Sequence, residues 1–258
     1  MTDSSPTSTT PALPVPSLER PSLMRLFGKG GSLEELRPAP PGESSQIPIR
    51  REEIVMVSAP HSRLAEQFRR LRNSIQALNP DGASRSVLLT SAIEGEGKTV
   101  AALNLGLAMT ELPHLRVCVV DGNRFHPSVE EYLGLPRRQG LGELLAGNLS
   151  MEQALRPTSR ERFDVIGAGA QSSDPVLNVD RMRSILNALK RRYDYVLIDA
   201  PPVLRASSPS LLAGIADGIL LVVRIGKTPK GMVEETFTMI ENLGGNVLGT
   251  CATSVDDF

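Results

Sequence analysis

A glycine-rich segment in the first half of the chain has the residue types and spacing of a phosphate-binding loop. It runs from Ser91 to Thr99 (SAIEGEGKT), after a short apolar run and before a segment with helical periodicity. Glycine at positions 95 and 97 lets backbone N–H groups turn toward phosphate oxygens, and the N-terminus of the following helix adds positive potential. We therefore predict a P-loop here.

The last two residues of this segment indicate what the loop binds. Lys98 can reach the β- and γ-phosphates of a nucleotide, and the Thr99 hydroxyl can contact Mg²⁺. The usual first glycine is Ala92, and no glycine lies three residues after Gly97, which excludes the dinucleotide-binding fingerprint. We expect ATP and Mg²⁺ as cofactors, bound by Glu94, Gly95, Glu96, Gly97, Lys98, Thr99 and Val100.

Two aspartates end apolar runs elsewhere in the chain. Val117–Val120 ends at Asp121, and Tyr195–Ile198 ends at Asp199, which Ala-Pro-Pro follows. Ligands of open parallel sheets bind beyond the carboxyl ends of the strands, although an aspartate there is also an ordinary turn residue. Asp199 fits the acid that holds magnesium, and Asp121 can accept a proton. We predict catalytic roles for Lys98, Asp121 and Asp199, and metal binding by Thr99, Asp121 and Asp199.

The elements that position these residues alternate between strand and helix. Helical periodicity covers residues 63–78, 98–111, 179–192 and 230–243. Unbroken apolar runs, typical of strands buried on both faces, lie between them at Val87–Leu89, Val117–Val120, Tyr195–Ile198 and Ile219–Val223. This alternation predicts an α/β P-loop NTPase fold, a mostly parallel twisted sheet with helices on both faces. We expect strands ending at Thr90, Asp121 and Asp199 to surround one pocket.

Composition divides the 258 residues into two parts. Residues 1–50 hold nine of the twenty prolines and predict a disordered arm, whereas residues 51–258 predict one ATPase or kinase-like domain. In the arm, Pro21 to Leu36 is either a short motif that folds on a partner or membrane, or an apolar linker.

The bulk properties favour a cytoplasmic protein without nucleic-acid partners. Cys118 and Cys251 lie in apolar runs, which indicates core residues in a reducing compartment. No apolar run reaches about 18 residues, and the N-terminus lacks the apolar core of a secretory signal. A net charge of −1 provides no field that would hold nucleic acid.

Several motifs together resemble the bacterial tyrosine kinases of exopolysaccharide and capsule assembly, P-loop ATPases related to cell-division and partition ATPases. The resemblance covers roughly residues 58–256. A lysine typical of the partition ATPases is Ile93 here, which favours the polysaccharide branch. The matching motifs are Glu66-x-x-Arg69-x-x-Arg72, the P-loop, VCVVDGNRFHP around Asp121, YDYVLIDAPPVL at 193–204 and ADGILLVVRIGKT at 216–228.

The resemblance implies a cytoplasmic ATPase that docks on a membrane polysaccharide co-polymerase at the inner membrane and phosphorylates tail tyrosines of its neighbour. It also implies a homo-oligomer formed through Glu66, Arg69 and Arg72. The other interpretation of this helix motif is internal pairing of Glu66 with Arg69 and Arg70.

Some family positions differ, so we expect nucleotide binding to survive better than phosphotransfer. Asn123 stands where the family has the second acid of the Asp121 motif, and Phe125 stands where it has the following arginine, with Arg124 displaced by one. Ser208 replaces a later acid of the family, and Thr253 replaces an asparagine that reads adenine. The tyrosines are Tyr132, Tyr193 and Tyr195, and no tyrosine-rich tail follows them. We expect no tail autophosphorylation, with Tyr195 buried, Tyr193 partly exposed and Tyr132 the most accessible.

Three functions remain open at this point. The leading one is an ATPase or protein tyrosine kinase that regulates exopolysaccharide or capsule biosynthesis. The alternative is a non-catalytic adaptor whose ATP-bound state a membrane co-polymerase recognises. A partition-type ATPase on DNA has little support, because it expects a basic surface.

Overall fold

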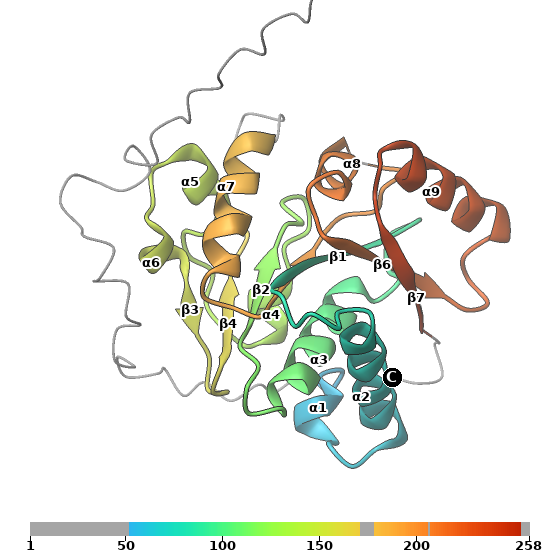
Figure 1. The fold of residues 1–258 in the computed structure, drawn as a ribbon, viewed down its shortest axis with the longest axis horizontal. Helices are drawn as coiled ribbons and strands as arrows, with labels where there is room; N and C mark the ends of the chain where they lie inside the picture. Colours follow the sequence, from blue (N-terminus) through green and yellow to red (C-terminus); the bar gives the residue numbers. More distant parts are fainter. Residues whose placement is uncertain (1–51, 171–177, 206, 254–258) are drawn as a thin grey trace, which may run out of the picture. The chain divides into compact units, whose positions relative to one another are not determined.

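The computed structural model describes residues 52–170, 178–205 and 207–253 (Figure 1). The predicted arm over residues 1–50, with its segment from Pro21 to Leu36, lies outside the described residues. No helix in the described ranges combines the length and apolar character needed to cross a membrane.

Seven strands form one sheet in the order β3-β4-β2-β5-β1-β6-β7. Neighbouring strands are parallel except β3, which is antiparallel to β4. The predicted parallel sheet and its four strands are confirmed, and β3, β4 and β7 are additional. The strands are β1 (Arg85–Ser91), β2 (Val117–Asp121), β3 (Arg156–Pro157), β4 (Phe163–Ile166), β5 (Tyr195–Asp199), β6 (Gly218–Arg224) and β7 (Val247–Thr253).

Helices cover both faces of the sheet, as predicted, and each face has its own apolar core (Figure 1). One face carries α1 (Val55–Ser58), α2 (Arg63–Ala77), α3 (Lys98–Thr110) and α4 (Val129–Tyr132). The other carries α5 (Leu141–Ala146), α6 (Met151–Ala154), α7 (Val179–Lys190), α8 (Ser207–Ala213) and α9 (Lys230–Asn242).

Helix α3 lies between α2 and the sheet, and twelve of its thirteen residues are buried. Such a helix is apolar on all sides because it has no solvent face. It packs closely on the sheet at Gly106, where an added Cβ would lie 2.7 Å from Phe163 Cε2 and 3.3 Å from Val119 Cγ2. This contact holds in place the helix whose first two residues are Lys98 and Thr99.

We expect Gly106→Ala to destabilise the fold by about 1–3 kcal/mol, because the new methyl group forces Phe163 or the helix to move. Urea unfolding followed by circular dichroism measures the change.

The matched control is Gly231→Ala in α9, where an added Cβ meets nothing within 4 Å. This variant should be unchanged or more stable by up to about 1 kcal/mol, because alanine loses less backbone entropy in a helix. Equal unfolding midpoints for the Gly106 variant and the wild type would contradict the close packing of α3 on the sheet.

Candidate functional site

Three adjacent strands bring the predicted site residues to one edge of the sheet. Strand β5 lies between β1 and β2, with Asp199 paired in register to Leu89 on one side and to Asp121 on the other. Neighbouring strands are about 4.8 Å apart, so the two aspartates and the start of the P-loop are close neighbours. The predicted convergence of the strand ends is confirmed.

The P-loop connects β1 to α3 through two glycines with left-handed backbone. Gly95 has φ 71° and Gly97, the N-cap of α3, has φ 85°, a region that other residues rarely adopt. The Lys98 ammonium folds back along the loop and donates to Ser91 Oγ at 2.8 Å. Burial lowers the pKa of Lys98, and the carboxylates of Asp199, Glu96 and Glu94 oppose this shift.

The Thr99 hydroxyl donates to Asp199 Oδ2 at 2.5 Å. Asp199 is fully buried, and its other oxygen, Oδ1, has no hydrogen-bond partner among the described residues. An unpaired buried carboxylate oxygen is costly unless a ligand satisfies it. Hydroxyl and carboxylate oxygens are what Mg²⁺ prefers, directly or through water, so Thr99 and Asp199 fit a magnesium ion beside bound phosphates.

Asp121 is held by the turn that follows β2. Its Oδ1 accepts from the Asn123 N–H at 3.1 Å, and its Oδ2 accepts from the N–H groups of Ser128 at 3.0 Å and Val129 at 3.1 Å. Burial raises the pKa of Asp121, and these three hydrogen bonds partly offset the rise. Burial also raises the pKa of Asp199, and the neighbouring Asp121 carboxylate raises it further. The pair therefore favours a proton or a cation.

Ser128 joins the two halves of the site and was missed in the sequence. Its hydroxyl lies 2.9 Å from Thr99 Oγ1, while its backbone N–H donates to Asp121. Asp121 is thus linked to Thr99 through one residue. A serine just before the acidic segment 129–132 (VEEY) is a helix N-cap signal that would have drawn attention to it.

Two family positions that differ in this chain have structural partners. Asn123 Oδ1 accepts from the His126 N–H at 3.2 Å, so the amide stabilises the turn beside Asp121. Thr253, at the end of β7, donates its hydroxyl to the Glu96 carbonyl at 2.9 Å. Phe125, in the same turn as Asn123, is 61% exposed. The Ser208 side chain lies outside the described atoms.

The expected partial exposure of Tyr193 is wrong. Its side chain is buried, and its hydroxyl donates to Asp164 Oδ2 at 2.6 Å. Burial, with the Cys118 and Asp164 side chains, raises the Tyr193 pKa far above its ordinary value. Tyr195 is buried as predicted, and Tyr132 is half-buried against the core on the α3 side.

The predicted assembly motif on α2 is partly an internal contact. Arg72, expected to contact a neighbouring copy, is buried and donates to Ala108 O at 2.8 Å and to Glu111 Oε2 at 3.1 Å. Arg69 pairs with the same Glu111 carboxylate at 2.6 Å. Glu66 lies 3.6 Å from Arg69, and its side chain is 54% exposed.

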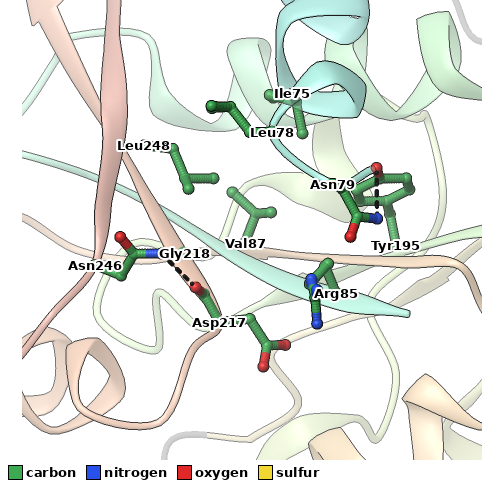
Figure 2. Close-up of a pocket in the computed structure, with 10 residues that line it drawn as sticks. All are labelled: Ile75, Leu78, Asn79, Arg85, Val87, Tyr195, Asp217, Gly218, Asn246 and Leu248. Atoms are coloured by element: carbon green, nitrogen blue, oxygen red, sulfur yellow. Dashed lines mark hydrogen bonds between the residues drawn. The ribbon is translucent and has the colours of Figure 1, made fainter. Parts of the chain in front are cut away.

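A pocket of about 260 Å³ lies at the opposite ends of the strands (Figure 2). Its lining includes Arg85, Tyr195 and Gly218, which begin β1, β5 and β6. The Asp217 carboxylate beside it already accepts from Ser86 and from Lys190. None of the P-loop residues lines this pocket, so it is separate from the candidate site.

We expect the free energy of unfolding of the protein without nucleotide to decrease as the pH rises from about 4 to about 7. The raised pKa values of Asp121 and Asp199 mean that the folded state keeps protons that the unfolded state has lost, so stability declines as the pH rises through the folded values. Asp199→Asn should flatten this decline, and millimolar Mg²⁺ should stabilise the wild type but not the variant at pH 8. Thermal unfolding from pH 5 to pH 8 measures both effects.

The matched control is Asp180→Asn, which removes a carboxylate that is 94% exposed and should leave the pH dependence as it is. If Asp199→Asn kept the slope of the wild type, the two buried carboxylates would not interact as described.

Comparison with known proteins shows which proteins this chain resembles. No protein-family model matches the chain. Tyrosine-protein kinase YwqD of Bacillus subtilis is 29% identical over 198 residues, which are 76% of this chain and 83% of that protein. Succinoglycan biosynthesis transport protein ExoP of Rhizobium meliloti is 26% identical over 215 residues, 81% of this chain but 27% of ExoP.

A solved structure agrees with these relatives. The kinase domain of the Escherichia coli tyrosine kinase ETK superposes with a TM-score of 0.75 at 25% identity and covers 88% of this chain and 85% of that domain. The chain is thus similar over most of its length to bacterial tyrosine kinases.

Proposed function

We propose that this chain binds ATP with Mg²⁺ and transfers the γ-phosphoryl group to a tyrosine of another polypeptide, in a system that makes exopolysaccharide or capsule. The observation that carries the proposal is the contact of Thr99 with Asp199 at the mouth of the P-loop, beside Asp121. A hydroxyl, two buried carboxylates and a lysine at adjacent strand ends are the parts that phosphoryl transfer needs.

Each residue has a defined task in this proposal. The backbone N–H groups of residues 94–100 surround the phosphates, and Lys98 leaves Ser91 to pair with their oxygens. Thr99 and Asp199 would hold Mg²⁺, which would neutralise charge on the β- and γ-phosphates. Asp121 accepts the proton of the attacking hydroxyl, a role for which its raised pKa suits it.

The acceptor is proposed to be external because the tyrosines of this chain are poorly placed. Tyr193 and Tyr195 are buried residues, and their hydroxyls are hydrogen-bonded to Asp164 and Asn79. Tyr132 packs against the core. In-line transfer needs the acceptor oxygen roughly 3–3.5 Å from the phosphorus, which a folded core residue does not reach.

A non-catalytic adaptor that reports its ATP-bound state to a partner is the second candidate. The observation in its favour is Asn123, an amide where the family carries an acid, whose oxygen is occupied by the His126 N–H. Loss of one aligned charge commonly reduces turnover by about 10²–10³. Nucleotide binding would survive this loss.

Single-turnover measurements test the proposal. Magnesium-dependent phosphate release or transfer to a tyrosine-containing peptide is expected in the wild type and should fall by about 10²–10³ in Lys98→Ala, because the lysine that pairs with the phosphates is gone. Intact-mass spectrometry should show no stoichiometric phosphotyrosine on the chain itself.

Lys230→Ala is the control, since this lysine is 90% exposed on α9 and should not affect turnover. Tight ATP binding without turnover would favour the adaptor, and a wild type that does not bind ATP would contradict both functions. Phosphorylation mapped to Tyr132 or Tyr193 would contradict an external acceptor.

The proposed partner is a membrane polysaccharide co-polymerase, which would hold the chain at the inner face of the membrane. Support comes from ExoP, a transport protein of succinoglycan biosynthesis, of which this chain matches about a quarter. We also propose a homo-oligomer in which Glu66, with Arg69 and Arg72, contributes to the contact between copies.

Glu66→Ala is the clean test of that contact, because removing either arginine would also break one of the two ion pairs that Glu111 makes inside the subunit. We expect a lower oligomer mass by light scattering with ATP. Gln67→Ala, on the same exposed part of α2, should keep the wild-type mass. An unchanged mass for Glu66→Ala would leave the motif with its internal role only.

A further inference from the structure

The phosphate loop contains an acid that the proposed chemistry does not use. Glu96 lies between the two left-handed glycines of the P-loop, and it is only 1% exposed. A carboxylate here repels the phosphates that the loop is proposed to bind, and burying it costs free energy unless both oxygens are hydrogen-bonded. Its contacts therefore indicate why it is present.

The Glu96 side chain joins two loops. Its Oε2 accepts from the backbone N–H of Ile93 at 2.9 Å, within the P-loop itself. Its Oε1 accepts from the backbone N–H of Arg224, the last residue of β6, at 3.1 Å and from the Thr228 hydroxyl in the connection between β6 and α9. The carbonyl of the same residue accepts from Thr253 at the end of β7.

The end of β6 and the connection to α9 also bring two cations to the P-loop. The Arg224 guanidinium donates to the Gly95 carbonyl at 3.2 Å. The Lys227 ammonium lies 3.4 Å from the place where a Cβ of Gly95 would be. Positive charge at this edge offsets the charge of Glu96 and favours a bound polyphosphate.

We propose that Glu96 is a positioning residue that fixes the P-loop in its phosphate-binding shape by joining it to the β6–α9 connection. A loop with glycine on both sides of Glu96 has many conformations, and ordering it at the moment of binding costs affinity. Hydrogen bonds to a charged acceptor are stronger than neutral ones, so the carboxylate orders the loop before the nucleotide arrives. The inference rests on the proposed ATP binding.

Calorimetric titration with MgATP and with magnesium pyrophosphate tests the role. In Glu96→Ala we expect the Kd for both ligands to rise by the same factor, about tenfold to a hundredfold, since pyrophosphate has no base or sugar and depends on the phosphate loop. Glu96→Gln should recover part of the loss, because its amide oxygen still accepts from Arg224 and Thr228.

Glu94→Ala is the charge control. The Glu94 side chain belongs to the same loop and is 55% exposed. Its removal relieves repulsion of the phosphates, so MgATP should bind more tightly. An affinity of Glu96→Ala equal to or tighter than that of the wild type would overturn the proposal. A wild type that does not bind MgATP would instead contradict the proposed function.

Urea unfolding of Glu96→Ala separates positioning from folding. If this variant does not fold, Thr228→Val, which removes one hydrogen bond of the same contact, keeps the test available. It should weaken binding of both ligands by about threefold or more while its unfolding midpoint stays near that of the wild type. A Thr228 variant with unchanged affinity would then overturn the role of Glu96.

Discussion

The burial of two carboxylates side by side is the constraint on which the rest of this site depends. Asp121 and Asp199 end adjacent parallel strands in register, and neither is more than 1% exposed. Two like charges in such a place are stable only with a proton or a cation between them. The Thr99 hydroxyl and the nearby Lys98 ammonium reduce this cost, and a magnesium nucleotide would remove more of it. The charge at this edge of the sheet therefore favours a bound cation.

Rigid elements around the carboxylates make this electrostatic arrangement specific. Helix α3 has almost no solvent face and contacts the sheet at a glycine, so Thr99 at its first turn has a fixed position relative to Asp199. The turn after β2 holds Asp121 by three backbone N–H groups. Ser128 belongs to that turn and also contacts Thr99. Sites supported in this way keep their geometry before the ligand binds.

Local patterns in the sequence were enough to predict the central strands, the P-loop and both aspartates. Each depends on residues close together in the chain, such as an unbroken apolar run or glycines at fixed spacing. Features that depend on distant partners were not predictable. Arg72 can be buried because its guanidinium donates to Glu111, a residue that follows the P-loop in the sequence whereas Arg72 precedes it. Tyr193 is buried because Asp164 lies on β4, a short strand that the sequence did not reveal.

The amide at Asn123 changes the balance of charge without disturbing this framework. Burial already raises the pKa of Asp121 and of Asp199, and the Asp121 carboxylate raises that of Asp199 further, so a third carboxylate beside them would add repulsion. Asn123 instead accepts from His126 and donates its backbone N–H to Asp121, so the turn keeps its hydrogen bonds with one negative charge fewer. The ligand-free site is then less strained, and its attraction for a divalent cation is weaker. We therefore expect the amide to affect phosphotransfer more than nucleotide binding, so the two must be measured separately in this chain.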